Sequence, residues 1–249
     1  MAPRVALVTG GHRRLGKAIA LSLARQGFDV AISYRSGADV AQQVAQELRG
    51  LGVRATAVAA ELTDPVQVQQ LVDQVTQQFG RLDAVIASAA SYRPTPLEQL
   101  DAKQFDAIMM ENARAPVDLL LAAAPWLRQS GDGRAVLMGD LAGFTPFRGY
   151  LAHSMAKAAL HAAVAGLAAE WAPQILVGGV APGAVLQPAE LADPDWRRLQ
   201  GAVPMGQTAL AQPEVPVEAV CAAVLWWLTC PRYAAGQVLR IDGGRSARW

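Results

Sequence analysis

The sequence is poor in the residues that build metal and redox sites. Its 249 residues include only two cysteines, Cys221 and Cys230, and three histidines that lie far apart along the chain. The cysteines lack a CxxC or metal-ligand spacing and fall in an apolar helical stretch, which is typical of buried free thiols. Because a transition-metal site gathers several such side chains, we expect no metal site.

Charge is also scarce and nearly balanced. Charged residues make up 17% of the chain and the net charge is +1, so no strongly basic surface favours nucleic acid or an anionic membrane. No apolar run reaches the ~18 residues that a membrane-spanning helix needs. The first residues enter a strand pattern directly and do not resemble a signal peptide. We therefore expect a soluble cytoplasmic protein with no nucleic-acid or membrane partner.

What the sequence does contain is a regular alternation of short apolar runs and longer helical patterns. The runs are too continuously apolar for half-exposed strands, as expected for a parallel sheet covered on both faces. This alternation predicts one domain over residues 1–249, an α/β doubly wound Rossmann fold with about seven parallel strands and helices on both faces. The expected strands are 4–9, 29–34, 54–58, 82–87, 135–139, 175–180 and 237–241, and the expected helices are 15–26, 38–48, 64–79, 112–128, 150–171 and 217–228.

One stretch, residues 187–216, breaks this alternation. It holds five prolines and Trp196, shows weak periodicity and follows a predicted strand. Long structureless insertions at the carboxyl edge of such a sheet are usually lids or binding loops. We expect this segment to be a substrate-binding lid.

The turn between the first strand and the first helix reads Thr-Gly-Gly-His-Arg-Arg-Leu-Gly over residues 9–16. Glycine permits a tight turn and a close approach of the backbone to a phosphate. The helix that follows offers free N–H groups and a favourable dipole to a pyrophosphate. The turn therefore predicts a dinucleotide site.

The end of the second predicted strand indicates which dinucleotide binds. An NAD site places an acidic residue there for the ribose 2′-hydroxyl, whereas an NADP site uses arginine. The chain has Tyr34, Arg35 and Ser36 at this point, and Asp29 lies too far back. Arginine suits a 2′-phosphate because its forked donors match the phosphate oxygens. We expect NADPH as the cofactor, with Arg13 or Arg14 assisting across the turn.

With the glycine turn, Asn112, Lys157 and the closing Asp-Gly-Gly-Arg-Ser in order, the whole chain resembles the short-chain dehydrogenase/reductase family. The active tetrad of that family is Asn, Ser, Tyr and Lys, and the resemblance puts Asn112 and Lys157 in their usual places. The cofactor-binding residues that it implies are Gly10, His12, Arg13, Arg14, Leu15, Gly16, Tyr34, Arg35, Ser36, Glu61, Leu62, Ser88, Ala89, Ala90, Lys157, Pro182 and Gly183.

The position of the family serine holds Asp140, which resembles the pteridine reductase branch of the family. The Arg-Leu-Gly of the turn, Pro-Thr-Pro-Leu at 94–97 and Met-Ala-Lys at 155–157 match the same branch. The resemblance implies substrate contacts from Arg14, Ser91, Tyr92 and Asp140, because a turn arginine and a stacked aromatic hold the pterin there. An aromatic ring suits a flat heterocycle.

The position of the family's catalytic tyrosine holds His153. His153 and Lys157 are four residues apart, so they share one helix face and the imidazole can point where the tyrosine would. Imidazole, with an ordinary pKa of about 6.5, can act as a general acid, and a nearby carboxylate favours its charged form. We expect an Asp140–His153 acid pair, with catalytic residues Asn112, Asp140, His153 and Lys157.

Other departures leave a second interpretation open. The family's Asn-Asn-Ala-Gly is Ser-Ala-Ala-Ser at 88–91, the sixth strand carries Gly178-Gly179, and Glu61 replaces an aspartate. The leading hypothesis is an NADPH-dependent pteridine reductase-like enzyme that transfers hydride to a C=N or C=O group. The alternatives are a 3-oxoacyl-(acyl carrier protein) reductase-like enzyme, against which Asp140 argues, and a catalytically impaired NADPH-binding protein.

Two further expectations concern the remaining histidines and assembly. We expect His12 to be exposed on the phosphate turn and His161 to pack against a neighbour rather than act in catalysis. The resemblance implies a homo-oligomer, a tetramer or a dimer, formed through the helices of Asn112 and Tyr150 and the C-terminal strand. Small residues would allow close helix packing there: Ala156, Ala158, Ala159, Ala162, Ala163 and Ala165.

Overall fold

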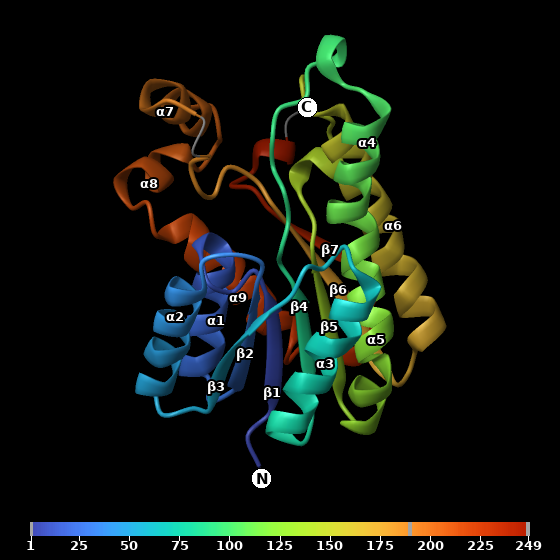
Figure 1. Cartoon of the computed structure of the whole chain (residues 1–249). Coiled ribbons are helices and arrows are strands. Elements are labelled where there is room, and N and C mark those ends of the chain that lie inside the picture. Colours follow the sequence, from blue (N-terminus) through green and yellow to red (C-terminus); the bar gives the residue numbers. More distant parts are fainter. Residues whose placement is uncertain (1, 189–190, 248–249) are drawn as a thin grey trace.

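The computed structural model describes residues 2–188 and 191–247, and its centre is one parallel sheet in the strand order β3-β2-β1-β4-β5-β6-β7 (Figure 1). Every neighbouring pair of strands is parallel, with in-register pairs such as Leu7 with Ala31 and Val85 with Ala135. The strands are β1 Val5–Thr9, β2 Asp29–Tyr34, β3 Ala55–Ala59, β4 Ala84–Ala87, β5 Gly133–Met138, β6 Ile175–Pro182 and β7 Val238–Ile241. The predicted doubly wound Rossmann fold is confirmed.

Helices cover both faces of the sheet, as the continuously apolar strands require. On one face α1 (Arg14–Arg25), α2 (Ala38–Gly50) and α9 (Val215–Trp227) pack on an apolar layer that includes Ile19, Leu48 and Val224. On the other face lie α3 (Pro65–Phe79), α5 (Ala115–Gln129) and α6 (Leu151–Trp171) (Figure 1). The strand order reverses between β1 and β4, so a crevice opens at their carboxyl ends, where α/β proteins of this class bind ligands.

Two helix starts follow the local chemistry of the sequence. The Asp64 side chain accepts a hydrogen bond from the Val66 amide, and Pro65 occupies the first helical position of α3, as the sequence predicts. The second start was missed: α4 (Ala102–Met109) begins at a capping box in which Asp101 and Gln104 bond each other's backbone.

The predicted helix over 112–128 is wrong at its beginning. A single π-helical turn, Met110–Arg114, joins α4 to α5, and Asn112 lies within it. Such turns carry one extra residue and are frequent at functional sites. The periodicity of apolar residues does not reveal a π-helical turn, because the helical pattern resumes in the residues after the turn.

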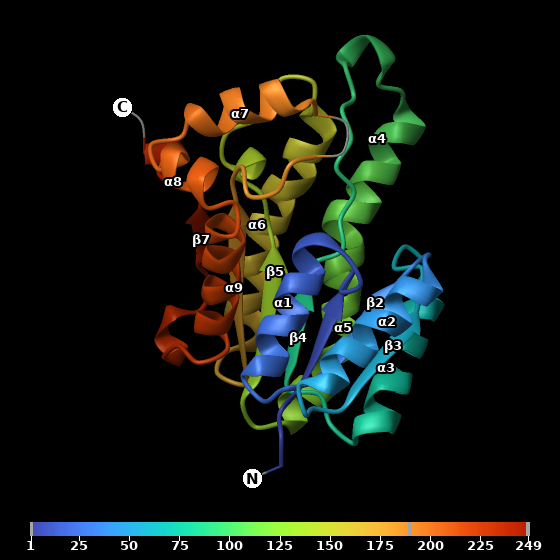
Figure 2. The ribbon, with the colours of Figure 1, turned by 90° about the vertical axis from the view of Figure 1, so that its left-hand side faces the viewer.

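The segment 187–216 differs from the expected structureless insertion. It forms two short helices, α7 (Asp193–Gly201) and α8 (Gly206–Ala211), which Figure 2 shows at the same end of the molecule as the carboxyl ends of the strands. Pro194 occupies an early position of α7 and so starts the helix rather than breaking it. We refer to residues 187–216 as the lid segment.

The remaining described turns are short 3-10 helices at η1 Leu97–Gln99, η3 Leu141–Gly143, η4 Arg232–Ala234 and η5 Arg245–Ala247. Cys221 and Cys230 are buried and free, as expected. Among the described residues, no helix combines the length and apolarity needed to cross a membrane, and no group of metal-ligating side chains is found.

Candidate active site

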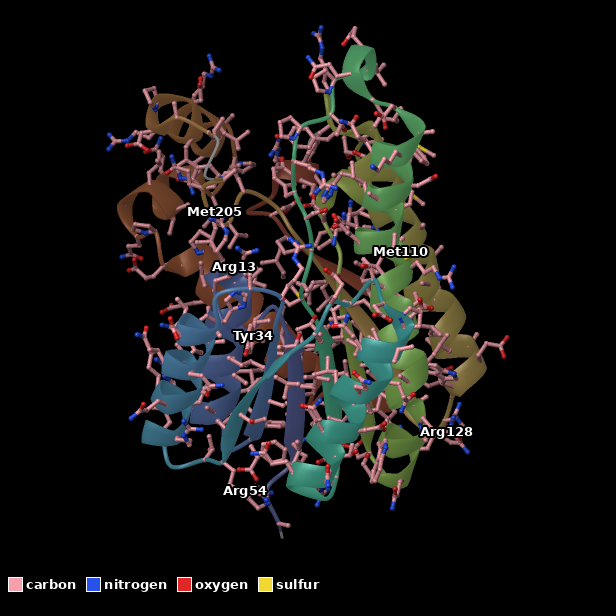
Figure 3. All side chains as sticks on the ribbon, viewed as in Figure 1. Arg13, Tyr34, Arg54, Met110, Arg128 and Met205 are labelled. Carbon is pink, nitrogen blue, oxygen red and sulfur yellow. The ribbon has the colours of Figure 1, made fainter. Side chains whose placement is uncertain are left out.

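A cavity of about 590 Å³ occupies the crevice at the carboxyl ends of the strands. Its walls come from the turn after β1, the ends of β2 and β3, the loop after β4, the start of α6 and the lid segment. This volume is typical of sites for cofactor-sized ligands. Figure 3 shows Arg13 and Tyr34 at this end of the sheet below Met205 of the lid segment, with Arg54 at the opposite end.

The turn after β1 is shaped by glycine. Gly10 has a positive φ of 64°, which L-residues rarely adopt. A Cβ at Gly11 would lie 2.5 Å from Ile32, and one at Gly16 would collide with the Gly10 carbonyl. The N-cap residue of α1, Arg13, makes no side-chain cap bond, and residues 13–16 at this helix start line the cavity. This cradle has the form that binds a pyrophosphate.

A threonine that the sequence analysis missed fixes the opposite wall of this cradle. The Thr9 hydroxyl accepts hydrogen bonds from the Ser88 amide at 2.9 Å and the Ala89 amide at 3.0 Å. The bonds tie the loop after β4 to the end of β1, two strands that are neighbours only because the sheet reverses there. Thr9 could have been found as the one polar residue at the end of an otherwise apolar strand.

Beyond the turn, the end of β2 supplies a second polar wall. Tyr34, Arg35 and Ser36 line the cavity opposite Arg13. Arg35 is largely exposed, and its guanidinium lies 3.7 Å from Oε2 of Glu61. The other carboxylate oxygen, Oε1, accepts hydrogen bonds from the amide and the hydroxyl of Thr63. Asp29 lies at the other end of β2 and bonds Arg54, so it is not part of this wall.

His12 corrects one expectation, because it is buried rather than exposed. Its ring packs edge-on against Tyr34, and its Nδ1 has no hydrogen-bond partner among the described residues. Burial, and then the charge of Arg13, lower the pKa of His12. The polar neighbours of His12 in the sequence suggest an exposed side chain. The turn instead directs His12 inward, where it supports the loop of Tyr34.

Arg14 joins the turn to the lid segment. It has a φ of 49° although it is not glycine, and its guanidinium donates a 2.8 Å bond to the Gln187 carbonyl. Non-glycine residues in this region are uncommon and cluster at functional sites. Its side chain is therefore held where the turn, the lid segment and the cavity meet.

Asn112 differs from the other predicted site residues, because it does not line the cavity. Its side chain is fully buried and bonds Ser91 twice, accepting from the Ser91 amide and donating to the Ser91 hydroxyl at 3.0 Å. It also donates to the Ile108 carbonyl. Asn112 thus positions the loop that carries Ser91 and Tyr92.

Lys157 is buried at the base of the cavity, where its Nζ donates a 2.8 Å bond to the Met138 carbonyl. Burial lowers the pKa of Lys157 to about 8, and the charge of Asp140 opposes this shift. The ammonium and the neutral amine are therefore both accessible near neutral pH. Such poised groups are typical of functional sites.

Asp140 and His153 meet beside this lysine. The Nε2 of His153 lies 3.5 Å from an Asp140 carboxylate oxygen, and the other carboxylate oxygen accepts a 2.7 Å bond from the Ala142 amide. His153 is 2% exposed, and neither ring nitrogen has a hydrogen-bond partner among the described residues. The loop after β5 and the helix α6 thus bring a carboxylate and an imidazole to one wall.

Tyr92 lies over this imidazole. Its ring packs edge-on against His153, with 5.1 Å between ring centroids, and stacks on Tyr150 at 4.6 Å. Burial, and next the hydroxyl of Tyr150, raise the pKa of Tyr92, so the phenol stays neutral. Tyr150 was not among the predicted site residues. It lies three residues before His153 and seven before Lys157, which puts it on the same helix face.

His161 behaves as expected for a packed residue. Its ring lies against Phe144, and a Cβ at Gly143 would lie 2.5 Å from it. Burial, with the charge of Lys157 adding, lowers the pKa of His161 to about 4. The ring is therefore neutral at pH 7 and fills the space behind the loop of Asp140.

Every predicted site residue except Asn112 lines the one cavity. The cavity also uses side chains that the sequence analysis did not select: Met138, Phe147, Leu186, Trp196, Leu199 and Arg245. Arg245 lies over the Phe147 ring, so the C-terminal segment folds back over the site. The closing Asp-Gly-Gly-Arg-Ser motif is the signal that could have identified it.

Comparison with known proteins agrees with this geometry. The sequence pattern of the family described as short chain dehydrogenase matches residues 4–197. The chain belongs to this family. It is therefore an oxidoreductase of a family that binds a nicotinamide cofactor, and the glycine cradle and the start of α1 fit such a cofactor.

Three relatives illustrate the range of similarity. An uncharacterised oxidoreductase of Mycobacterium tuberculosis is 34% identical and covers 97% of this chain and 91% of its own. A hydroxynaphthalene reductase of Aspergillus fumigatus is 34% identical over 73% of this chain and 66% of its own length. A crystal structure of a short chain dehydrogenase from Burkholderia cenocepacia in complex with NADP has a TM-score of 0.84 and 36% identity, with 98% of each chain covered.

Proposed function

We propose that this protein is an NADPH-dependent reductase that transfers hydride to a C=N or C=O group of a flat bicyclic substrate, with a dihydropterin as the leading candidate. The observation that carries the proposal is the Asp140–His153 pair on the cavity wall beside Lys157. In this proposal, His153 supplies the proton that the tyrosine of the family pattern would supply.

The choice of NADPH rests on the wall at the end of β2. Arg35 and Ser36 present donors to the space where the adenosine ribose would lie, and no acidic residue ends this strand. Arg35 already faces the Glu61 carboxylate at 3.7 Å, a weak pairing that a dianionic phosphate would outcompete. The Burkholderia relative with NADP supports the same choice.

The protein's own residues then have separable roles. NADPH, when bound, supplies the hydride, and the reduced product needs one proton as NADP⁺ forms. His153 donates that proton from its imidazolium form, and the Asp140 carboxylate at 3.5 Å stabilises the charge. Lys157 holds the ribose through its ammonium, while Asn112 positions the loop that carries the substrate contacts.

The proposed substrate class follows from the Tyr92 ring. Tyr92 lines the cavity beside His153 and is 37% exposed, so one flat ligand can pack against it next to the proton donor. Ser91 and Arg14 add hydrogen-bonding groups at the rim. The name of the Aspergillus relative, a hydroxynaphthalene reductase, supports a flat bicyclic substrate as well.

A second candidate function, NADPH binding with little turnover, is favoured by one observation. His153 is only 2% exposed, and Tyr92 covers it. The imidazole therefore offers little surface to a substrate in the cavity. A 3-oxoacyl-(acyl carrier protein) reductase is disfavoured, because Asp140 stands where that subgroup has serine.

The test follows NADPH oxidation by the purified protein with a dihydropterin and, in parallel, with a hydroxylated naphthalenone. NADPH binding is measured separately by fluorescence. Turnover that is lost in His153→Ala supports the acid pair. Full activity in His153→Ala contradicts it, and NADPH binding without turnover on either substrate favours the second candidate function.

We also propose that the chain is a homo-oligomer through α5 and α6. Four of the six small residues of α6 are exposed, Ala158, Ala159, Ala162 and Ala165, whereas Ala156 is buried inside the chain. Leu151 and Met155 extend this exposed apolar strip. Light scattering should give a dimer or tetramer that Ala162→Glu dissociates, and a monomeric native protein would refute the proposal.

A further inference from the structure

A second cavity lies on the far side of the lid helix α7 from the cofactor cavity and has a volume of about 200 Å³. Its walls come from the segment after β6, from α7, α8 and the start of α9, and from the end of β7. Its described lining residues are Ala184, Val185, Gln200, Val203, Met205, Gly206, Thr208, Ala209, Val215, Pro216, Ala219, Ile241, Asp242 and Gly243.

The chemistry of this cavity is largely apolar with one unusual polar group. Gln200 is 4% exposed, and it is part of the wall of this cavity. Asp242 is not comparable, because its two carboxylate oxygens accept bonds from the Gly244 and Ser246 amides. A ligand that carries one hydrogen-bonding group can pair with the Gln200 amide in this otherwise largely apolar cavity.

The size of the cavity limits the ligand. An apolar protein cavity of about 150 Å³ can hold a benzene molecule. A volume of about 200 Å³ therefore accommodates one aromatic ring with a small substituent, but not a dinucleotide or a whole bicyclic substrate with its side chain. The apolar residues Val185, Val203 and Ile241 provide the walls that such a ring packs against.

Helix α7 is the partition between the two cavities. Trp196 and Leu199 line the cofactor cavity, whereas Gln200 of the same helix and Val203, which follows its end, line the second one. Ala184 and Val185 belong to both walls. A ligand in the second cavity therefore packs against the helix that closes the first, and it biases the position of Trp196 over the cofactor.

We propose that this cavity is a binding site for a single aromatic ring bearing one hydrogen-bonding group, that Gln200 recognises this group, and that occupancy is coupled to cofactor binding through α7. The binding step does not depend on the proposed reductase activity; the coupling rests on the proposed NADPH site. Because coupling is reciprocal, NADPH must change the ring's affinity by the factor by which the ring changes NADPH affinity.

The first experiment compares phenol with toluene, which has the same size and lacks the hydroxyl. The methyl groups of the six methionines are labelled with ¹³C, since Met205 lines the second cavity and Met138 lines the cofactor cavity. We expect phenol to shift the Met205 signal with a Kd on the order of 1 mM and to leave Met138 in place. Unmoved Met205 at saturating phenol overturns the proposal.

Variants then test the recognition and the location. Gln200→Leu should weaken the binding of phenol about tenfold, because phenol loses a hydrogen bond. The binding of toluene, which has no hydroxyl, should be unchanged or tighter. Ala209→Phe fills the cavity and should abolish both, whereas Ala211→Phe, exposed on the same helix and absent from the lining, should not. Equal loss of phenol and toluene in Gln200→Leu would contradict the role of the amide.

The coupling is measured as the Kd of NADPH with and without phenol. A change of at least twofold, matched by the reciprocal change in phenol affinity, supports the partition role of α7; identical values overturn it. Ala209→Phe should shift NADPH affinity in the same direction as phenol. A dihydropterin that displaces phenol from Met205 identifies the ring as part of the substrate, and simultaneous binding identifies a separate effector.

Discussion

The two halves of the cofactor cavity are built by different means. The half that faces β1 and β2 is made largely of backbone: Gly10 at positive φ, the uncapped amides of α1 and the Thr9 hydroxyl that ties β1 to β4. The half that faces α6 and the lid segment is made of side chains, and there His153 contacts both Asp140 and Tyr92.

This difference shows which half of the cavity sets the chemistry of the reaction. A backbone cradle binds a phosphate through groups that every residue has, so it needs only room and the right φ. The substrate half depends on individual functional groups, so one substitution changes the chemistry without disturbing the fold. Lys157 belongs to both halves, since it lies at the cofactor floor beside Asp140. Single substitutions can therefore separate the two halves.

The largest effect should come from Lys157→Met, which removes the one charge shared by both halves. We expect kcat/KM to fall by about 10³-fold or more, because both ribose positioning and the electrostatics of the acid pair are lost. Steady-state kinetics with NADPH checks this, with circular dichroism as the fold control. A variant that keeps more than a tenth of the native activity would remove Lys157 from the proposed machinery.

Next in size is His153→Gln, which changes only the substrate half. Turnover should fall by about 10²-fold to 10³-fold, because the proton donor is lost, while the Kd of NADPH stays within about twofold. The matched control is His161→Gln on the same helix, which lies behind the site and should keep most of its turnover. Equal losses in the two variants would point to helix damage rather than acid catalysis.

Arg35→Ala changes only the cofactor half. The KM for NADPH should rise about tenfold to a hundredfold through loss of charged hydrogen bonds to the 2′-phosphate, with kcat nearly unchanged and the KM for NADH unaffected. Arg25→Ala, an exposed arginine at the end of α1 away from the cavity, is the control. A parallel rise in the KM for NADH would show that Arg35 does not read the 2′-phosphate.

The smallest effect is the pH dependence of cofactor affinity. The pKa of Lys157 is lowered to about 8, so its ammonium is present below pH 8 and is lost as pH rises above it. NADPH binding should therefore weaken above pH 8, by up to about tenfold per unit. Lys157→Arg keeps its charge in this range and should bind NADPH independently of pH. If the dependence persists in that variant, another group causes it.

The two halves also differed in how well the sequence predicted them. Glycines and the end of β2 leave local signals, and the residues predicted from them line the cavity. The inward position of His12 and the bonds of Thr9 were not predicted. In the substrate half, contacts between residues far apart in the sequence determine which side chains come together. The stacking of Tyr92 on Tyr150, the helices of the lid segment and the return of Arg245 all bring together residues that are distant in sequence.

Asn112 shows the same limit within one helix. Its identity and importance were predicted, but its place was not, because the π-helical turn that contains it leaves the apolar pattern on both sides intact. The structure turns it toward Ser91 instead of the cavity. Asn112 can thus support the site, as its residue type indicates, through a contact with Ser91 that its residue type does not indicate.

That π-helical turn makes the length of the chain matter as much as its composition. Removing one residue within Met110–Arg114 would let α4 continue into α5 as a regular helix, because the π-helical turn accommodates one extra residue. Asn112 would then point away from Ser91, although every neighbouring side chain kept its identity. A single-residue deletion here should therefore be more damaging than most substitutions, and an insertion elsewhere in the same connection would not compensate for it.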